Sequence, residues 1–291
     1  MNGVTLLAPA KLNLTLDITG IEPNGFHAMD MLMQAVSLCE RVTVERAGDL
    51  VITAPGASLP LGEKNVAWKA AVAFFDGVGL LAGAHIRLEK ATPVRAGMGG
   101  GSADAAAVLA ALNLLYGAQL TLPELCRIGA GVGADVPFAL TGGTARVRGF
   151  GERITPLPPL PDCRFVVCMP GYGVSTPQAF ASYDRVGAGA RPNNDAAEAA
   201  LRRGDVPALW PCLANALQKA SAGRDTARIC RLLTGAGAKA ALMTGSGAAV
   251  YGIFADDAAA AGGEAALRAA GFARVWVLAP AAHGPAVEQT F

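Results

Sequence analysis

The sequence has few charged and few aromatic residues, and neither sign of charge dominates. Charged residues make up 16% and aromatic residues 6% of the 291 positions, and 24 Lys and Arg stand against 23 Asp and Glu, for a net charge of +1. Nucleic acids and anionic membranes are normally bound by a clustered positive field, so this balance argues against both as partners. A bound anion would have to be held by a few local cations and backbone N–H groups.

Long apolar runs and paired cysteines are missing as well. No run approaches the roughly 18–20 residues needed to cross a bilayer, and residues 1–10 lack the basic start of a secretory signal. The six cysteines form no C-x-x-C pair, so their spacing suits neither a zinc site nor a disulfide framework. We therefore expect a cytoplasmic protein with reduced thiols. No feature of the sequence defines an oligomeric state.

What the chain does contain is apolar residues, 52% of the total, arranged in both strand and helix patterns. Alternation of apolar and polar residues predicts a strand over 12–18, and apolar residues at three- and four-residue steps predict a helix over 108–116. Gly117 is expected to end that helix, and the capping-box spacing of Thr121 and Glu124 predicts the start of another. Strands and helices do not alternate strictly, which favours an α+β fold in two domains. The proline-rich stretch PLPPLP, residues 156–161, is the candidate boundary, so the predicted domains are 1–155 and 162–291.

The most informative stretch is PVRAGMGGGSADAA, residues 93–106. It is not a Walker A loop, because no lysine follows Gly101, and it is not G-x-G-x-x-G, because Ser102 holds the sixth place. Three consecutive glycines before an alanine-rich helix still leave backbone N–H groups open to a ligand, and the helix dipole favours an anion there. We therefore predict that this glycine loop, residues 93–101, binds phosphate, with Ser102 as helix cap or hydroxyl donor. The alternative is a flexible loop before a capped helix.

Four other features are each compatible with an ordinary structural role. Lys11 and Asn13 are two apart in a predicted strand and so share one face. Phe26 and His27 follow an Asn-Gly turn. Asp135 is the one acid in GVGADVPFAL, and we expect it to be exposed, paired, or the N-cap of a short helix. The TGSG loop between two later strands permits close approach of a ligand or of another backbone.

Taken in order, these motifs resemble those of the GHMP kinases over essentially the whole chain. PAKLNLTLDITG followed by GFH resembles the first motif, PVRAGMGGGSADAA the phosphate loop, GADVPF the segment of the catalytic acid, and TGSGAAVYGIF the third glycine motif. The first motif with its aromatic–His pair, together with MPGYGVSTPQAF, most resembles the branch that phosphorylates the 2-hydroxyl of 4-diphosphocytidyl-2-C-methyl-D-erythritol. The resemblance implies a two-domain GHMP-kinase-like α+β fold with the active site in the cleft between domains.

The resemblance also implies ATP as the phosphoryl donor, with Asp135 as general base and Lys11 as its partner, bonded to it and close to the γ-phosphate. The implied nucleotide-binding residues are Asn65, Pro93, Val94, Arg95, Ala96, Gly97, Met98, Gly99, Gly100, Gly101, Ser102 and Ala103. Phosphoryl transfer from ATP predicts Mg²⁺, but the resemblance identifies no metal ligand in this sequence.

For the small-molecule acceptor, the resemblance implies a pyrimidine pocket. Phe26 would stack on the cytosine ring, His27 would bond its polar edge, Thr176 and Phe180 would complete the pocket, and Asn13 would help hold the acceptor end. Phe26 stands where tyrosine is common, which keeps stacking and loses a phenol hydrogen bond. Residues 215–218 (NALQ) resemble a degraded N-D-L-E signature and receive no role.

Three alternative functions remain. Another GHMP kinase, acting on homoserine or a mevalonate-type alcohol, would share the glycine loop, but a stacking aromatic at Phe26 beside His27 suits a base. A nucleotide-binding relative without turnover would have lost Lys11 or Asp135, and both are present. A non-specific RNA binder is disfavoured by the balanced charge and the few aromatics.

Overall fold

The computed structural model describes residues 1–21, 25, 27–221 and 223–291. These residues form two sheets whose strands are mostly antiparallel. Among these residues, eight strands form a first sheet in the order β12-β1-β3-β5-β4, with β2 and β6 paired to β3 and β7 paired to β6. Its strands are β1 (Gly3–Asn13), β2 (Asp17–Ile21), β3 (His27–Ala47), β4 (Leu50–Thr53), β5 (Gly83–Glu89), β6 (Thr144–Gly149), β7 (Arg153–Pro156) and β12 (Ala286–Thr290).

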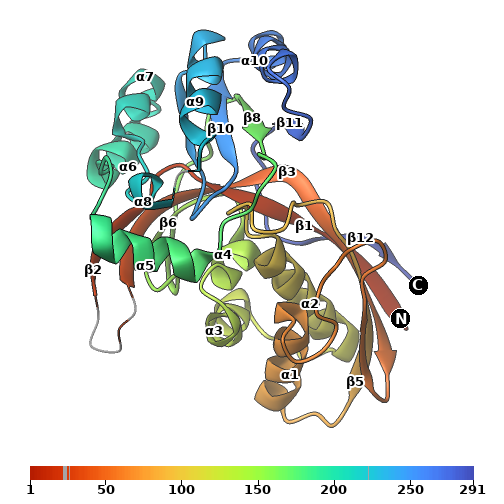
Figure 1. Cartoon of the computed structure of the whole chain (residues 1–291). Helices are drawn as coiled ribbons and strands as arrows, with labels where there is room; N and C mark the ends of the chain where they lie inside the picture. Colours follow the sequence, from red (N-terminus) through yellow and green to blue (C-terminus); the bar gives the residue numbers. More distant parts are fainter. Residues whose placement is uncertain (22–24, 26, 222) are drawn as a thin grey trace.

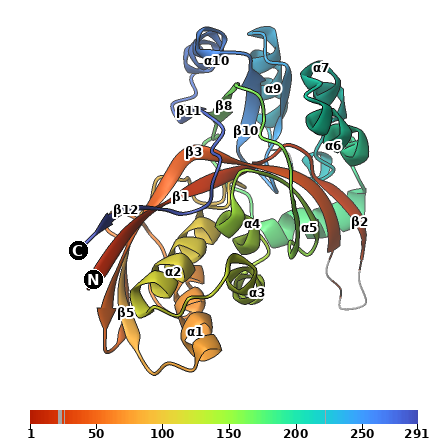
Figure 2. The same ribbon diagram turned by 180° about the vertical axis from the view of Figure 1, so that it is seen from behind.

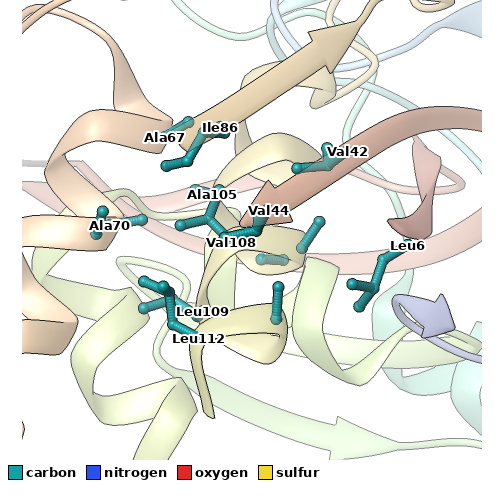
Figure 3. Close-up of a cluster of buried hydrophobic side chains, with 14 of the residues drawn as sticks. Leu6, Val42, Val44, Ala67, Ala70, Ile86, Ala105, Val108, Leu109 and Leu112 are labelled. Carbon is teal, nitrogen blue, oxygen red and sulfur yellow. The ribbon is translucent and has the colours of Figure 1, made fainter. Parts of the chain in front are cut away.

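One face of the first sheet is covered by four helices (Figure 1). They are α1 (Val66–Val78), α2 (Gly100–Tyr116), α3 (Leu122–Val132) and α4 (Val136–Thr141). Along β3, Val42 and Val44 are fully buried against these helices because alternate residues of a strand point to one face. The alanine-rich α2 is buried on nearly all sides, and its small residues let α1 and the sheet pack closely against it. Figure 3 shows this core.

A second sheet of four strands, in the order β11-β8-β10-β9, is built from the later part of the described chain. Its elements are β8 (Arg164–Cys168), α5 (Thr176–Val186), α6 (Asn194–Arg203), α7 (Val206–Leu209), a 3₁₀ turn (Trp210–Cys212), α8 (Gln218–Ser221), α9 (Thr226–Gly235), β9 (Ala240–Met243), β10 (Val250–Phe254), α10 (Asp257–Ala269) and β11 (Val275–Leu278). The strand order β11-β8-β10-β9 is that of a ferredoxin-like βαββαβ unit. Helices α9 and α10 pack on it.

The two sheets share buried side chains. Leu12 on β1 and Leu32 on β3 belong to the same cluster as Phe165 on β8 and Tyr251 on β10. Figures 1 and 2 show β1 and β3 running between helices α1–α4 on one side and the second sheet on the other. The chain therefore folds as predicted, α+β in two parts whose contact surface includes the end of β1.

The end of the chain returns to the first sheet. Strand β12 pairs antiparallel with β1, and the N–H groups of Asn2 and Gly3 donate to the carbonyl of Phe291, so the two termini lie side by side (Figure 2). We propose that the domain boundary lies at residues 156–161, between β7 and β8, with β12 returning across it.

Several local predictions are confirmed. Helix α2 ends at Gly117, whose φ of 63° is the left-handed conformation that glycine adopts readily. At the start of α3, the Glu124 carboxylate accepts from the backbone N–H of Thr121 at 2.7 Å, as the capping-box spacing predicts.

The strand predicted over 12–18 is wrong in its bounds. β1 ends at Asn13 and β2 begins at Asp17, and between them the N–H groups of Leu14 and Thr15 both turn to the carbonyl of Leu32. Apolar alternation continues through this turn because its leucines are buried, so the pattern does not reveal the break. No described helix has the length and apolar character that crossing a membrane requires.

Candidate active site

A cavity of about 1240 Å³ lies where the two parts of the molecule meet. The first part contributes β1, the glycine loop and the turn before α4, and the second part contributes the start of α5 and the loop between β9 and β10. The expected cleft is therefore present. The predicted site residues that line it are Lys11, Asn13, His27, Asn65, Pro93, Val94, Arg95, Ala96, Gly97, Met98, Gly99, Gly100, Gly101, Ser102, Asp135, Thr176 and Phe180.

Of the predicted site residues that the structure describes, Ala103 is not among those that line the cavity. Ala103 is buried in the core beneath the first turn of α2. Phe26 lies outside the described residues, so its stacking role stays a prediction. Asn65 lines the cavity, but its side chain caps α1: its oxygen accepts from the N–H of Ala67 at 2.9 Å and its amide donates to the carbonyl of Pro60 at 2.7 Å.

Lys11 and Asp135 meet in the cavity although 124 positions separate them. The Lys11 Nζ lies 3.3 Å from Asp135 Oδ2 and donates to Asn13 Oδ1 at 2.7 Å. Asp135 stands at the N-cap position of α4, but its side chain makes no capping hydrogen bond. The lysine side chain is 8% exposed and the aspartate side chain 29%. The carboxylate therefore faces the cavity beside a buried ammonium group.

Asn13 accepts a hydrogen bond from this lysine, and its own backbone and side chain are held by contacts with three other residues. Its backbone N–H donates to Thr244 Oγ1 at 3.0 Å, its carbonyl accepts from the Tyr251 hydroxyl at 2.8 Å, and its side-chain amide contacts Met31 Sδ at 3.3 Å. Neither Thr244 nor Tyr251 was expected from the sequence to support the site. The only signal was that TGSGAAVYGIF resembles a family motif.

Helix α2 begins three residues earlier than an N-cap at Ser102 would require. Gly99 is the N-cap, with φ of 71°, and the helix begins at Gly100. Ser102 therefore lies within the first turn and does not cap it. The N–H groups at the start of a helix have no intrahelical partner, and here they adjoin the cavity.

The glycines are also required by the protein's own packing. A Cβ on Gly97 would lie 2.3 Å from the carbonyl oxygen of Thr244, and a Cβ on Gly99 would lie 2.9 Å from Cγ of Lys11. In addition, the Lys11 N–H donates to the carbonyl of Met98 at 3.0 Å. The loop is thus packed against the residues of the lysine–aspartate pair, which adds a reason for glycine besides open amides.

His27 and Phe180, which also line the cavity, form a ring pair. Their centroids are 4.8 Å apart at an interplanar angle of 37°. His27 Nε2 lies 2.7 Å from Asp184 Oδ1, so a carboxylate orients the imidazole. Thr176 Oγ1 and Ser246 Oγ lie 2.9 Å apart nearby. Asp184 was missed by sequence reasoning because nothing in its local pattern sets it apart from an exposed helix acid.

A second lysine, Lys90, lies beside the glycine loop between two acids. Its Nζ is 2.9 Å from Glu40 Oε1 and also bonds Asp104 Oδ2 and the carbonyl of Gly100. Burial raises the pKa of Asp104 to about 7; Lys90 opposes this shift and Glu40 adds to it. Glu40 in turn accepts from the N–H groups of Ala91 and Thr92. The cluster therefore joins both ends of the glycine loop to β3.

The described residues do not offer a free set of ligands for a magnesium ion. They contain no group of three or more His, Cys, Asp or Glu arranged to hold a metal. Asp104 Oδ1 has no hydrogen-bond partner in the described chain, but that atom is buried, and Asp135 is paired with Lys11. Magnesium commonly binds through substrate phosphates and keeps several waters, so we assign no residue to it.

Comparison with known proteins places this chain in a family. Residues 65–143 match the model of the GHMP kinases N terminal domain, and residues 197–273 match the GHMP kinases C terminal model. Together with the relatives below, these matches show that the chain belongs to the GHMP kinases.

Two relatives and a solved structure carry the name of one kinase. A 4-diphosphocytidyl-2-C-methyl-D-erythritol kinase of Pelotomaculum thermopropionicum is 42% identical over 260 residues, which cover 87% of this chain and 90% of the relative. The kinase of that name from Symbiobacterium thermophilum is 40% identical, with 85% and 89% covered. The crystal structure of a 4-(cytidine 5'-diphospho)-2C-methyl-D-erythritol kinase is similar with a TM-score of 0.78 and 34% identity, with 95% of this chain and 98% of that chain covered.

Proposed function

We propose that this chain is an ATP-dependent kinase that phosphorylates the 2-hydroxyl of 4-diphosphocytidyl-2-C-methyl-D-erythritol, a step of the non-mevalonate route to isoprenoid precursors. The observation that carries the proposal is the Lys11–Asp135 pair, 3.3 Å apart in the cavity that the glycine loop also lines. The relatives of that name, alike over most of both chains, support the choice of substrate.

The donor phosphates are bound at the glycine loop. The N–H groups of Gly100, Gly101 and Ser102 are available at the N-terminus of α2, where the helix dipole favours an anion. The Lys11 side chain packs against Gly99 of the same loop, so its ammonium group would be close to a γ-phosphate bound there. ATP as donor follows from the kinase family; magnesium, which would neutralise phosphate charge when bound, stays a prediction.

Transfer of the phosphoryl group then needs positioning and little covalent chemistry from the protein. The acceptor oxygen attacks the γ-phosphorus, the bond from that phosphorus to the bridging oxygen of ADP breaks, and the hydroxyl proton passes to the carboxylate of Asp135. Lys11 lies beside the carboxylate and stabilises charge on the reacting oxygens. Asn13, which accepts from Lys11, holds the ammonium in place.

The cytosine of the acceptor is bound on the side of the cavity formed by His27 and Phe180. An aromatic ring offers a stacking surface to any base, and the imidazole supplies a hydrogen bond to its edge. Asp184, at 2.7 Å from Nε2, leaves Nδ1 of His27 for the base. Phe26 supplies the second stacking surface in this proposal, and Thr176 completes the pocket.

The direct test is to incubate the protein with ATP, Mg²⁺ and 4-diphosphocytidyl-2-C-methyl-D-erythritol and to look for ADP and a singly phosphorylated product by mass spectrometry. Homoserine and mevalonate in parallel reactions are the controls for other GHMP chemistries. Turnover of either control above that of the cytidine compound would overturn the substrate proposal.

A binding test separates the cytidine pocket from catalysis. CMP alone should raise the melting temperature, and this shift should vanish in Phe26→Ala and in His27→Ala. No shift with the unaltered protein would contradict a pyrimidine pocket and would favour another acceptor.

A further inference from the structure

The segment NALQ, residues 215–218, makes side-chain hydrogen bonds to the end of β9 and to the β9–β10 loop (residues 244–249). The Asn215 amide donates to the carbonyls of Met243 and Gly245, each at 2.8 Å, while its oxygen accepts from the N–H of Leu217 at 2.9 Å. Gln218 Oε1 accepts from the N–H of Met243 at 2.8 Å. Asn215 is 3% exposed, so these bonds are shielded from water.

The β9–β10 loop in turn forms several hydrogen bonds with the glycine loop. Thr244 Oγ1 donates to the carbonyl of Gly97 at 3.3 Å. The N–H groups of Ala248 and Ala249 donate to the carbonyls of Arg95 and Ala96 at 3.2 and 3.1 Å. The fit is tight, because a Cβ on Gly245 would lie 2.8 Å from the carbonyl oxygen of Gly97.

The same loop reaches the lysine–aspartate pair. Thr244 Oγ1 accepts from the N–H of Asn13 at 3.0 Å, and Asn13 accepts from the Lys11 ammonium. One hydroxyl therefore connects the loop that Asn215 holds both to the glycine loop and to the residue beside the reacting groups. A shift of Gly245 by a fraction of an ångström would move Thr244 and, through it, both parts of the site.

We propose that Asn215 is a positioning residue for phosphoryl transfer: its two amide bonds hold the β9–β10 loop so that Thr244 sets the distance between the glycine loop and Lys11. Gln218 adds one bond to Met243, the last residue of β9 before this loop. The proposal rests on the proposed function for its kinetic readout, but its binding readout needs only ATP. Asn215 touches no reacting atom and acts through Thr244.

The first experiment compares Asn215→Ala with Asn113→Ala. Asn113 is a matched control because its side chain makes the same kind of backbone clamp, donating to the carbonyl and accepting from the N–H of Leu120, each at 2.9 Å, and it does not line the cavity. Both variants should melt at lower temperature. Measured well below either melting temperature, Asn215→Ala should lose at least tenfold in kcat and weaken ATP binding severalfold, whereas Asn113→Ala keeps both.

Two further variants keep the test decisive if Asn215→Ala does not fold. Asn215→Asp retains the acceptor for Leu217 but removes both donors, so its kinetic loss should equal or exceed that of the alanine variant. Thr244→Val keeps the shape of the side chain and removes the hydroxyl, and it should show the same loss of kcat.

Failure of the positioning role can be distinguished from failure of the proposed kinase activity. Full kcat and unchanged ATP affinity in Asn215→Asp or Thr244→Val would overturn the positioning role. If the unaltered protein failed to phosphorylate the cytidine compound, ATP titration by calorimetry would still decide the matter: weaker binding in Asn215→Asp than in Asn113→Ala supports the proposal, and equal binding overturns it.

Discussion

Two lysine–aspartate pairs lie at the edges of one cavity, and they differ in what surrounds them. Lys11 faces one acid, Asp135, whose side chain is 29% exposed. Lys90 faces two acids, Glu40 and Asp104, and none of the three side chains is more than 10% exposed. In the first pair the carboxylate remains open to a substrate, and in the second each charge is enclosed by protein.

The role of each lysine therefore depends on its access to the cavity and on its partners, and residue type alone does not assign it. Glu40 and Lys90 form hydrogen bonds with the backbone at the two ends of the glycine loop. Glu40 accepts from Ala91 and Thr92, and Lys90 donates to Gly100. Lys11 instead bonds one side chain, Asn13, and reaches the cavity. We therefore assign chemistry to the open pair and support of the loop to the enclosed cluster, and four substitutions test this contrast.

The largest effect is expected for Asp135→Asn. The amide is the same shape but cannot take the acceptor proton, so kcat should fall by about 10²–10⁴ while ATP binding is retained. Steady-state kinetics with ATP titration by calorimetry measure the two quantities. Turnover within threefold of the unaltered enzyme would refute the assignment of Asp135 as base.

Lys11→Met should follow, with kcat lower by about 10²–10³. The substitution keeps an apolar stem of similar length and removes the ammonium that stabilises charge on the transferred group. The stem packs against Gly99, so the fold should be kept. A normal circular-dichroism spectrum together with an undiminished kcat would show that this charge has no part in transfer.

Lys90→Met should affect stability more than chemistry. It leaves the buried carboxyl groups of Glu40 and Asp104 facing each other without a cation, which typically costs about 3–5 kcal/mol in the free energy of unfolding. Urea denaturation measures this loss. Arg202→Met is the comparison, because its pair with Glu198 is an exposed i,i+4 pair on α6 and should cost less than about 1 kcal/mol. Equal losses in the two variants would contradict the contrast between enclosed and open charges.

The smallest effect is a change in the pH dependence of stability in Asp104→Asn. The folded protein favours protonated Asp104, with a pKa of about 7, whereas the unfolded acid ionises near pH 4. This group therefore contributes stability that is complete below about pH 4 and is lost as the pH rises toward 7. Asparagine does not titrate, so the variant should gain melting temperature relative to the unaltered protein as the pH rises from about 4 to about 7. Parallel curves would show that Asp104 is ionised throughout.

Much of the local structure was predictable from the sequence. Glycine at 117 ended a helix, the Thr121–Glu124 spacing began another, and the glycines before α2 indicated a loop with open amides. The resemblance to a family named the pair Lys11 and Asp135, which the structure places together. The break after Asn13 was missed, since buried leucines continue the alternation through a turn.

The contacts of two other residues of the site could not be predicted from a single sequence. Asp184 meets His27 across 157 positions and Thr244 meets Asn13 across 231. Neither residue differs in its local pattern from an exposed helix acid or a loop threonine.

Glycine content and apolar periodicity act over a few residues, so they indicate without any structure where the chain can expose backbone amides and where it must bury apolar side chains. Tertiary structure alone decided which lysine faces an open carboxylate and which is enclosed. That distinction depends on partners tens to hundreds of positions away, which meet when the first sheet and its helices fold, and on access to a cavity that exists only where the two parts of the molecule meet.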